Sequence, residues 1–191
     1  MRKIILASRS KARRALLKQI GLKFTVAGSS VKESRRLKGN CADLVIGNAL
    51  LKAQDAARRY ASGIVIAADT VVLVDGKIIG KPRDIQDAFR TLKLLSRRPQ
   101  WVYSGLAVID IDKNKIFTSY VKTKIFMLPL SGRQIHDYFK RVSPLDKAGS
   151  FDIQGLGSIF IDRIEGCFYN VVGLPLAELA SILGKLGVKL F

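Results

Sequence analysis

Apolar positions along the chain follow two different spacings, and the first half of the chain alternates between them. Stretches rich in Ile, Val, Leu and Ala predict strands over 3–7, 23–27 and 64–74. Apolar residues spaced three and four apart, with polar residues between them, predict helices over 10–20 and 41–60. Strands that alternate with helices are typical of an α/β protein.

Turn signals divide the second half into shorter elements. Asp75-Gly76 predicts a tight hairpin between the strand over 64–74 and a short strand over 77–79. The remaining predictions are a helix over 84–95, strands over 100–111 and 115–127 around Lys113-Asn114, a helix over 131–141 with Ser131 as its N-cap, a glycine-rich loop over 143–157, a strand over 158–164 and a helix over 175–187 with Pro175 in its first turn. Because hairpins and crossovers occur together, we expect a mixed sheet.

The composition is that of an ordinary globular protein of one domain. Of the 191 residues, 48% are apolar and 25% are charged, which excludes a disordered chain. No apolar stretch approaches the roughly 18 residues of a membrane helix. The apolar run over 4–7 is too short for a signal peptide. We therefore expect a cytoplasmic protein with no membrane partner.

Basic residues outnumber acidic ones by 33 to 15, which gives a net charge of +18. Such a charge attracts anions, from small phosphates to nucleic acids. The basic residues are scattered, however, with short clusters at Arg13-Arg14, Arg35-Arg36, Arg58-Arg59 and Arg97-Arg98. Scattered charge is mostly solvated surface, so the composition does not favour nucleic acid as a partner.

Histidine and cysteine are too sparse for most metal or nucleophilic sites. His136 is the single histidine and lies in a polar helical pattern, so we expect it at the surface or between lobes. Cys41 and Cys167 form no C-x-x-C pair, which favours two reduced thiols in or near the core. Any metal would therefore be held by oxygen ligands, which points to Mg²⁺ or Mn²⁺.

The segment "LASRSKARRALL" places hydroxyls and cations directly after the first predicted strand. If Ser8 or Ser10 caps the helix, then Lys11, Arg13 and Arg14 crowd its first turn, where the helix dipole disfavours cations. A bound phosphate would reverse that effect, because free N–H groups and cations then converge on it. The alternative is that these side chains extend into water; we favour the phosphate site.

Asp69 is the anomaly in the apolar stretch "GIVIAADTVVLV", because an unpaired carboxylate in a strand buried on both faces would cost several kcal/mol. A cleft that contains a metal ion and cationic side chains would compensate it. Asp69 and Glu33 could hold Mg²⁺. Arg13, Lys52 and Lys81 could neutralise phosphate charge, as phosphoryl chemistry requires. The alternatives are a solvated Lys52 and a Glu33 that pairs with its basic neighbours.

Several stretches resemble, in order, the motifs of the Maf family of nucleoside triphosphate pyrophosphatases, also described as septum-formation inhibitors. They are "LASRS" with "RRALL", "AADTVV", "GKPRD", "YSGLAV", "PLDKAGSFDIQGLGSIFI" and "NVVGLPL", and they cover nearly the whole chain. The resemblance implies one Maf-like domain over 1–191 with an ITPase-like α/β fold, in which a mixed twisted sheet with helices forms two lobes around a central cleft. It also implies a homodimer.

The same resemblance implies a reaction and assigns residues to it. The reaction is metal-dependent hydrolysis between the α and β phosphates of a nucleoside triphosphate, which yields the monophosphate and pyrophosphate. Asp69 matches the catalytic acid-base. Carried over by motif position, the catalytic residues are Asp69, Glu33, Lys52 and Lys81, the metal-binding residues are Glu33 and Asp69, and the substrate-binding residues are Ser8 and Arg13 at the phosphates and Thr70 and Gln154 at the base.

The motifs also bear on which base is preferred. "ADT" and "DKAG" with "IQG" resemble the branch of the family that acts on dTTP and UTP, where Gln154 can pair with the uracil or thymine edge. The N-terminal "SKARR" departs from that branch, since it lacks a proline and Ala12 stands where an arginine is usual. A 7-methyl-GTP or broader-specificity pyrophosphatase is therefore one alternative. An alternative of another class is a nucleic-acid-binding or septum-formation regulatory protein with a vestigial pocket.

Overall fold

A computed structural model describes residues 2–36 and 39–190, which fall into two compact units. Unit 1 comprises Met1–Thr70, Tyr103–Val121 and Tyr169–Phe191, and unit 2 comprises Val71–Val102 and Lys122–Phe168. Among the described residues, seven strands form one mixed sheet in the order β2-β1-β3-β5-β6-β7, with β4 paired to β3. The strands β3 (Ile64–Val74), β5 (Gln100–Asp110) and β6 (Lys115–Met127) contribute to both units. The predicted fold class, α/β with a mixed sheet, is confirmed.

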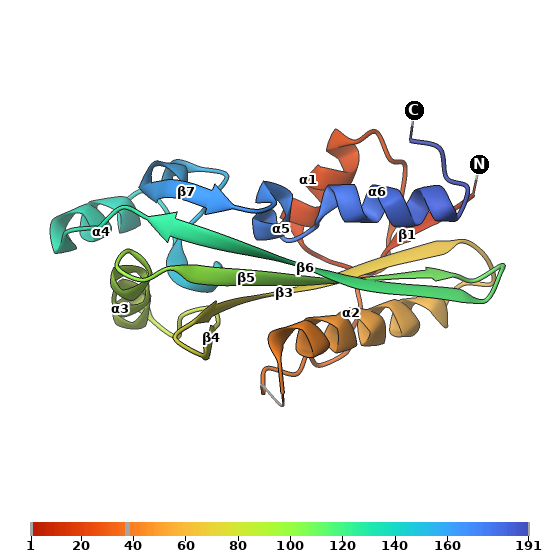
Figure 1. The fold of residues 1–191 in the computed structure, drawn as a ribbon, viewed down its shortest axis with the longest axis horizontal. Helices are drawn as coiled ribbons and strands as arrows, with labels where there is room; N and C mark the ends of the chain where they lie inside the picture. Colours follow the sequence, from red (N-terminus) through yellow and green to blue (C-terminus); the bar gives the residue numbers. More distant parts are fainter. Residues whose placement is uncertain (1, 37–38, 191) are drawn as a thin grey trace. The chain divides into compact units, whose positions relative to one another are not determined.

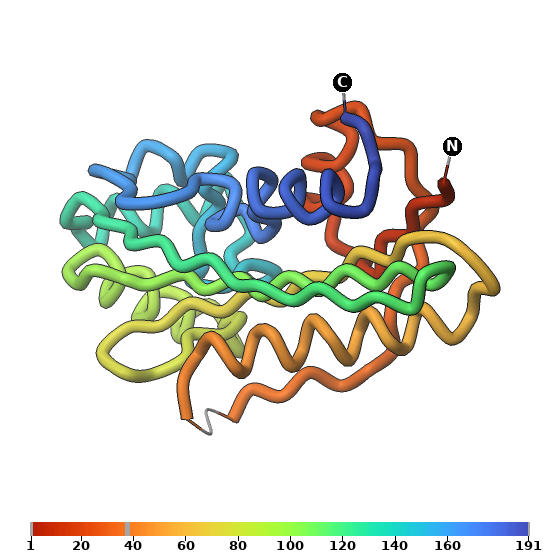
Figure 2. The backbone as a smooth tube through the Cα atoms, turned by 45° about the vertical axis from the view of Figure 1, so that its right-hand side comes forward, coloured from red at the N-terminus to blue at the C-terminus, as the bar shows by residue number. Residues whose placement is uncertain are grey.

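Unit 1 holds parallel strands between helices. β1 (Ile4–Leu6) pairs in parallel with β2 (Thr25–Val26) and with β3. Figure 1 and Figure 2 show α2 (Cys41–Ala57) along one face of these strands, and α1 (Lys11–Gln19) and α6 (Leu176–Lys185) on the opposite face. The helices are amphipathic, so each buries its apolar side against the sheet.

Side chains of β3 alternate between two hydrophobic cores, because successive residues of a strand point to opposite faces. Ile64, Ile66 and Ala68 pack in the core that includes residues of α1 and α6. Val65 and Ala67 pack in the other core, against alanines of α2. The same alternation continues to Asp69 and Thr70, the last residues of β3 in unit 1, where polar side chains take the place of apolar ones.

Asp69 and Thr70 extend the two rows of β3 toward opposite helices. Asp69 reaches α2, and Thr70 reaches Arg13 of α1. The neighbouring strand β5 approaches α2 closely at Gly105, where an added Cβ would lie 2.2 Å from the carbonyl oxygen of Val45. Only glycine permits this approach, and it brings α2 near enough to the sheet for its polar side chains to meet Asp69.

Unit 2 is built from a hairpin, short helices and loops. Its elements are β4 (Lys77–Ile79), α3 (Ile85–Leu95), α4 (Gly132–Phe139), the 3-10 helices η1 (Ala148–Ser150) and η2 (Leu156–Phe160), and β7 (Ile161–Glu165). β3 and β4 pair in antiparallel fashion around Asp75 and Gly76, whose positive φ angles of 47° and 75° fit the predicted tight turn. α3 packs against η1 and α4, and β7 pairs in antiparallel fashion with β6.

Two predictions about these elements are wrong, and one helix is not predicted. The strand predicted over 158–164 starts later, because Leu156–Phe160 form a 3-10 helix and the pairing with β6 begins at Ile161. The pattern does not predict α5 (Phe168–Val172), whose five residues are too few to show a helical period. Pro175 is the N-cap of α6 rather than a residue of its first turn. The predicted caps Ser10 and Ser131 are confirmed.

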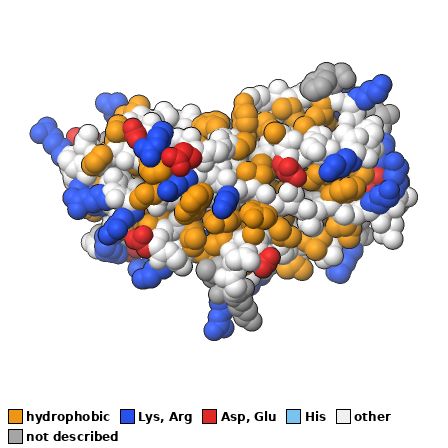
Figure 3. Space-filling model, viewed as in Figure 1, with side chains coloured by type: hydrophobic (Ala, Val, Ile, Leu, Met, Phe, Trp, Pro, Cys, Tyr) orange, Lys and Arg blue, Asp and Glu red, His pale blue; other side chains and the backbone are white. Residues whose placement is uncertain are grey.

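The structure agrees with the predictions from the sequence for the spread of surface charge, for His136 and for the two cysteines. On the face shown in Figure 3, Lys and Arg side chains are spread in small groups rather than gathered in one patch. His136 is exposed on α4 and stacks on Phe89, with 4.8 Å between the ring centroids. Cys41 and Cys167 are free thiols, and burial raises the pKa of Cys41. None of the described helices is both long and apolar enough to span a bilayer.

Candidate functional site

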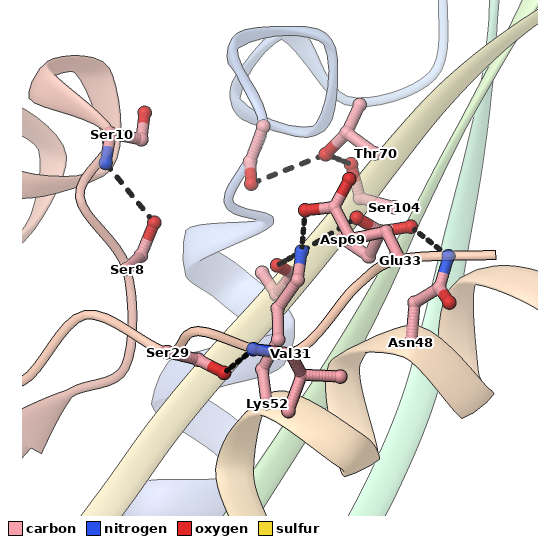
Figure 4. Close-up of polar contacts among 12 residues, drawn as sticks. Ser8, Ser10, Ser29, Val31, Glu33, Asn48, Lys52, Asp69, Thr70 and Ser104 are labelled. Carbon is pink, nitrogen blue, oxygen red and sulfur yellow. Dashed lines mark hydrogen bonds and ion pairs between the residues drawn. The ribbon is translucent and has the colours of Figure 1, made fainter. Parts of the chain in front are cut away.

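Asp69 is only 4% exposed, and each of its carboxylate oxygens meets a donor from α2. The Nζ atom of Lys52 lies 2.7 Å from Oδ1, and Nδ2 of Asn48 donates to Oδ2 at 2.8 Å. Asn48 and Lys52 are four residues apart, so they lie one turn apart on the same face of the helix. Both oxygens of this buried carboxylate are therefore paired (Figure 4).

Glu33 brings a second carboxylate to the same ammonium group. Its Oε1 lies 2.6 Å from Nζ of Lys52, which also donates to the carbonyl of Ala68 at 3.2 Å. Burial disfavours the ionised form of Glu33, but the hydrogen bond and charge of Lys52, together with the charges of Arg35 and Arg13, lower the pKa of Glu33. Two carboxylates thus share one buried ammonium, and Arg35 lies 3.4 Å from the other oxygen of Glu33.

Asn48 also contacts the loop that carries Glu33. Its Nδ2 donates to the carbonyl of Ser34 at 2.9 Å, and its Oδ1 accepts from the N–H of Ser34 at 2.9 Å. Earlier in the same loop, the N–H of Val31 donates to Oγ of Ser29 at 3.1 Å (Figure 4). The loop is thus held by side chains rather than by a regular strand or helix.

Arg13 is the centre of a second polar group on the opposite face of β3. Its Nε donates to the carbonyl of Gly173 at 2.8 Å and its Nη2 to Oγ1 of Thr70 at 3.1 Å. Oγ of Ser104 lies 2.8 Å from Oγ1 of Thr70 and donates to the carbonyl of Asn170 at 3.0 Å. Because the single hydroxyl proton of Ser104 is used there, Thr70 donates to Ser104 and accepts from Arg13.

The N-terminus of α1 adjoins this group. Ser10 caps the helix by accepting from the N–H of Arg13 at 3.3 Å, while Oγ of Ser8 accepts from the N–H of Ser10 at 3.2 Å and from Nη1 of Arg13 at 3.4 Å. Burial lowers the pKa of Arg13, and the charges of Asp69 and Glu33 oppose that effect. The two polar groups are therefore electrostatically coupled. Contacts with described residues use three of the five guanidinium N–H donors, which leaves two for an anion.

A divalent cation fits the carboxylate pair by charge and by ligand type. Among the residues that the structure describes, no group of three or more His, Cys, Asp or Glu side chains could hold a metal. Glu33 and Asp69 can supply two carboxylates, whose oxygens are the ligand type that such a cation prefers. Mg²⁺ is commonly bound through one or two carboxylates and completes its shell with water and substrate phosphates. Glu33 and Asp69 would hold such an ion.

Lys81 and Gln154 lie in unit 2, on loops that contact each other. The exposed Lys81 follows Gly80, whose carbonyl accepts from the N–H of Gly149 at 3.4 Å, and Gly149 belongs to the loop that leads to Gln154. Oδ1 of Asp152 accepts from the N–H of Gln154 at 3.1 Å, and the Gln154 side chain is exposed. That these two residues share a cleft with Asp69 stays a prediction.

The structure sorts the predicted residues into groups and adds two that the sequence reasoning missed. It brings Glu33, Lys52 and Asp69 together in one cluster, Ser8, Arg13 and Thr70 together in another, and leaves Lys81 and Gln154 on the loops of unit 2. The missed residues are Asn48 and Ser104. Their only signal is a polar side chain on an otherwise buried face, one helical turn before Lys52 for Asn48 and within the buried β5 for Ser104.

Comparison with known proteins finds one family over nearly the whole chain. The model of the family described as Maf-like protein matches residues 3–186. A protein of Dictyoglomus turgidum named dTTP/UTP pyrophosphatase is 46% identical over all of both chains. Proteins with the same name from Methanosarcina barkeri and from Clostridium botulinum strain 657 are 45% and 43% identical over all of this chain and over 98% and 100% of their own lengths.

Two solved structures share the fold at low sequence identity. A HAM1 protein from Coxiella burnetii has a TM-score of 0.54 at 14% identity and covers 97% of this chain and 100% of its own. The Ham1 protein of Staphylococcus aureus has a TM-score of 0.50 at 17% identity and covers 96% and 98%. This likeness concerns the fold alone and agrees with the ITPase-like architecture that the motifs imply.

Proposed function

Because the chain belongs to the Maf-like protein family, we propose that residues 1–191 form one Maf-like domain that hydrolyses dTTP and UTP to the nucleoside monophosphate and pyrophosphate. Full-length relatives named dTTP/UTP pyrophosphatase support this substrate class. The observation that carries the proposal is the cluster of Glu33, Lys52 and Asp69, because a buried strand has no structural need for a carboxylate.

Asp69 acts in this proposal as the base that takes a proton from water. The oxygen of that water then attacks the α phosphorus, the bond from the α phosphorus to the bridging oxygen breaks, and pyrophosphate leaves with the bridging oxygen. Lys52 holds Asp69 and Glu33 in place and lowers the electrostatic cost of bringing a polyanion to two carboxylates. A divalent metal, Mg²⁺ or Mn²⁺, held by Glu33 and Asp69 would supply further charge neutralisation when bound.

Substrate binding is divided between phosphates and base. Ser8 and Arg13 contact the phosphates, which fits the two guanidinium donors that the contacts of Arg13 with the described residues leave. Lys81 contributes a further cation to the phosphates. Thr70 and Gln154 help select the base, and the Gln154 amide can both donate to and accept from the edge of uracil or thymine. A homodimer, a cytoplasmic location and metal dependence belong to the same proposal.

Product analysis with and without Asp69 tests the function. Wild-type protein and Asp69→Asn are incubated with dTTP, UTP, CTP and 7-methyl-GTP in the presence of Mg²⁺ or Mn²⁺, and the phosphate products are resolved by ³¹P NMR. We expect pyrophosphate and monophosphate from dTTP and UTP, a loss of turnover in Asp69→Asn, and retained nucleotide binding, since the amide keeps the shape of the carboxylate. Asp75→Asn is the matched control, because an Asn-Gly pair suits the same tight turn.

The other outcomes are informative. Cleavage mainly of 7-methyl-GTP would identify the other branch of the family and would mean that the departure at Ala12 outweighs Thr70 and Gln154. Normal turnover by Asp69→Asn would remove Asp69 from the mechanism. If neither metal supports cleavage of any of the four nucleotides, the vestigial pocket becomes the better interpretation.

A further inference from the structure

The side-chain amide of Asn48 is fully hydrogen-bonded in a buried position, at 3% exposure. One proton of Nδ2 goes to Oδ2 of Asp69 and the other to the carbonyl of Ser34, while Oδ1 accepts the N–H of Ser34. The orientation of the amide follows from its partners, because a carboxylate and a carbonyl only accept and an N–H only donates. No other orientation satisfies all three groups.

These contacts connect the two carboxylates of the site by a route separate from Lys52. Lys52 contacts the side chains of Glu33 and Asp69 directly. Asn48 contacts the other oxygen of Asp69 and both backbone groups of Ser34, the residue that follows Glu33. The Asp69 carboxylate is therefore held at two points, and the Glu33 loop is held both through its carboxylate and through the backbone of Ser34, in each case by the same face of α2.

Lys52 and Asn48 differ in how their contacts respond when a substrate binds. Phosphates compete for the ammonium of Lys52, and a metal ion competes with it for the carboxylates, so its contacts with Glu33 and Asp69 change with the contents of the site. Asn48 is neutral, so neither a phosphate nor a metal ion is drawn to it by charge. A neutral donor also adds no cation to a cluster that must attract a divalent metal.

We propose that Asn48 is a positioning residue, which fixes the rotamer of Asp69 and the distance between Asp69 and the Glu33 loop during hydrolysis. This inference rests on the proposed pyrophosphatase function. Asn48 touches neither the reacting phosphorus nor the attacking water; it acts through Asp69 and Ser34. Partners of this kind around metal-binding groups typically contribute 10–100-fold to activity or metal affinity.

Two variants test these contacts. Asn48→Ala removes all three hydrogen bonds, whereas Asn48→Asp keeps an acceptor for the Ser34 N–H and replaces the donor to Asp69 and to the Ser34 carbonyl by an oxygen. We expect both variants to lower kcat for dTTP by about 10–100-fold, with KM unchanged, because the phosphate contacts of Arg13 lie on the opposite face of β3. Hydrogen exchange of the Ser34 amide, measured without substrate, should accelerate in Asn48→Ala and stay slower in Asn48→Asp.

Asn40→Ala is the matched control, since it makes the same substitution in the N-cap of the same helix, where the side chain accepts from the N–H of Asp43 and donates to its carboxylate. It weakens α2 without touching Asp69 or Ser34, so kcat and Ser34 exchange should stay at the wild-type values. An equal loss of kcat in Asn40→Ala would overturn the positioning role, because general weakening of the helix would then suffice.

The two proposals fail in different ways. Wild-type protein that cleaves no nucleoside triphosphate overturns the function and the catalytic role of Asn48 together. Active wild-type protein with a kcat for Asn48→Ala or Asn48→Asp within twofold of it overturns only the positioning role. Unchanged exchange at Ser34 in Asn48→Ala would show that the Glu33 loop does not depend on Asn48, and would also overturn the proposal.

Discussion

Asp69 illustrates, at the scale of single residues, why a buried ion pair is better explained by reactivity than by stability. The side chains of Asp69 and Lys52 are 6% and 8% exposed, so both charges lose most of their hydration. Apolar residues of similar size would often be as stable or more stable in such a place. Glu33 shares the same ammonium, so two carboxylates lie at one place, as a divalent cation requires.

Gln154→Glu should change the base preference. The glutamine amide can donate to and accept from a base, whereas an ionised glutamate only accepts. An unsatisfied hydrogen bond of this kind costs about 1–3 kcal/mol, so kcat/KM for dTTP and UTP should fall by about tenfold or more relative to 7-methyl-GTP. Competition assays with mixed nucleotides measure the ratio directly.

Gln19→Glu provides the control for added negative charge, because Gln19 is exposed on α1 and belongs to unit 1. It should leave the ratio of rates for different bases as it is in the wild type. Identical ratios in Gln154→Glu and Gln19→Glu would mean that Gln154 does not read the base.

At the scale of elements, the contact between α2 and β5 determines how far the polar side chains of α2 lie from Asp69. Because residue 105 is a glycine, the backbone of α2 can approach β5 closely at Val45, one turn before Asn48. Since α2 supplies both Asn48 and Lys52, the distance from the helix to the sheet sets the distance from those side chains to Asp69. A rigid packing contact thus determines hydrogen-bond geometry one and two turns away.

Gly105→Ala should therefore lower both stability and turnover. The new methyl group would lie 2.2 Å from a backbone oxygen and must push α2 away from the sheet. Such overpacking typically costs about 1–3 kcal/mol of the free energy of unfolding, and the shift should also lower kcat. Urea denaturation and steady-state kinetics check the two effects.

Gly47→Ala is the matched control, made within α2 itself. An added Cβ at Gly47 has no atom within 4 Å, and alanine is the better helix former, so we expect stabilisation by about 0.5–1 kcal/mol. If Gly105→Ala behaves like Gly47→Ala, the close approach of α2 is not a constraint.

Arg2 and Asp110 tie the start of the chain to the end of β5. Both oxygens of Asp110 accept from the guanidinium of Arg2, one of them at 2.7 Å, and the Asp110 side chain is fully buried. The hydrogen bond from Arg2 lowers the pKa of Asp110, although burial opposes this. Because the folded-state pKa is lowered, the contribution to stability is complete above the ordinary value of 3.8 and is lost as the pH falls through the lowered value.

Arg2→Met should accordingly reduce the free energy of unfolding near pH 7 by about 1–3 kcal/mol, because a buried carboxylate loses its partner. The difference from wild type should shrink as the pH falls below 3.8. Urea titrations at several pH values between about 7 and 2.5 follow both trends. Arg133→Met, at an exposed pair 3.9 Å from Asp137, should change stability by less than about 0.5 kcal/mol at every pH. A difference for Arg2→Met that does not depend on pH would argue against the ion pair.

The net charge of +18 acts at the scale of the whole molecule. On the face shown in Figure 3 the Lys and Arg side chains are spread in small groups, so on that face the charge produces a general field rather than a binding patch. A nucleoside triphosphate is a polyanion, so this field should raise the rate at which substrate meets the protein. Salt screens such a field over a Debye length of about 10 Å at 0.1 M ionic strength.

We therefore expect kcat/KM for dTTP to fall severalfold between about 0.02 M and 0.2 M KCl, with a smaller change in kcat. Stopped-flow or steady-state kinetics at constant free metal concentration measure this dependence. Sucrose at matched osmolality is the control, since it does not screen charge. A kcat/KM that is the same at both salt concentrations would show that the charge does not steer substrate.

Much of this protein can be read from local sequence. The strands β3, β4 and β6 and the cap Ser131 follow from apolar stretches, turn pairs and capping chemistry, all of which depend on neighbours within a few residues. The anomaly of Asp69 is visible for the same reason, since one charge interrupts an apolar run. The family resemblance adds residue roles because its motifs are long and ordered.

What local sequence cannot provide is the partner of each polar group. Asp69 meets Asn48 and Lys52 across 21 and 17 positions of the chain, and Arg13 meets Gly173 across 160. Such contacts exist only after strands and helices pack, because packing brings distant positions within hydrogen-bond reach. Asn48 therefore passes as an ordinary helical residue until α2 is placed against β3. The sequence supplies the chemical groups of the site, and the tertiary structure decides which of them are joined.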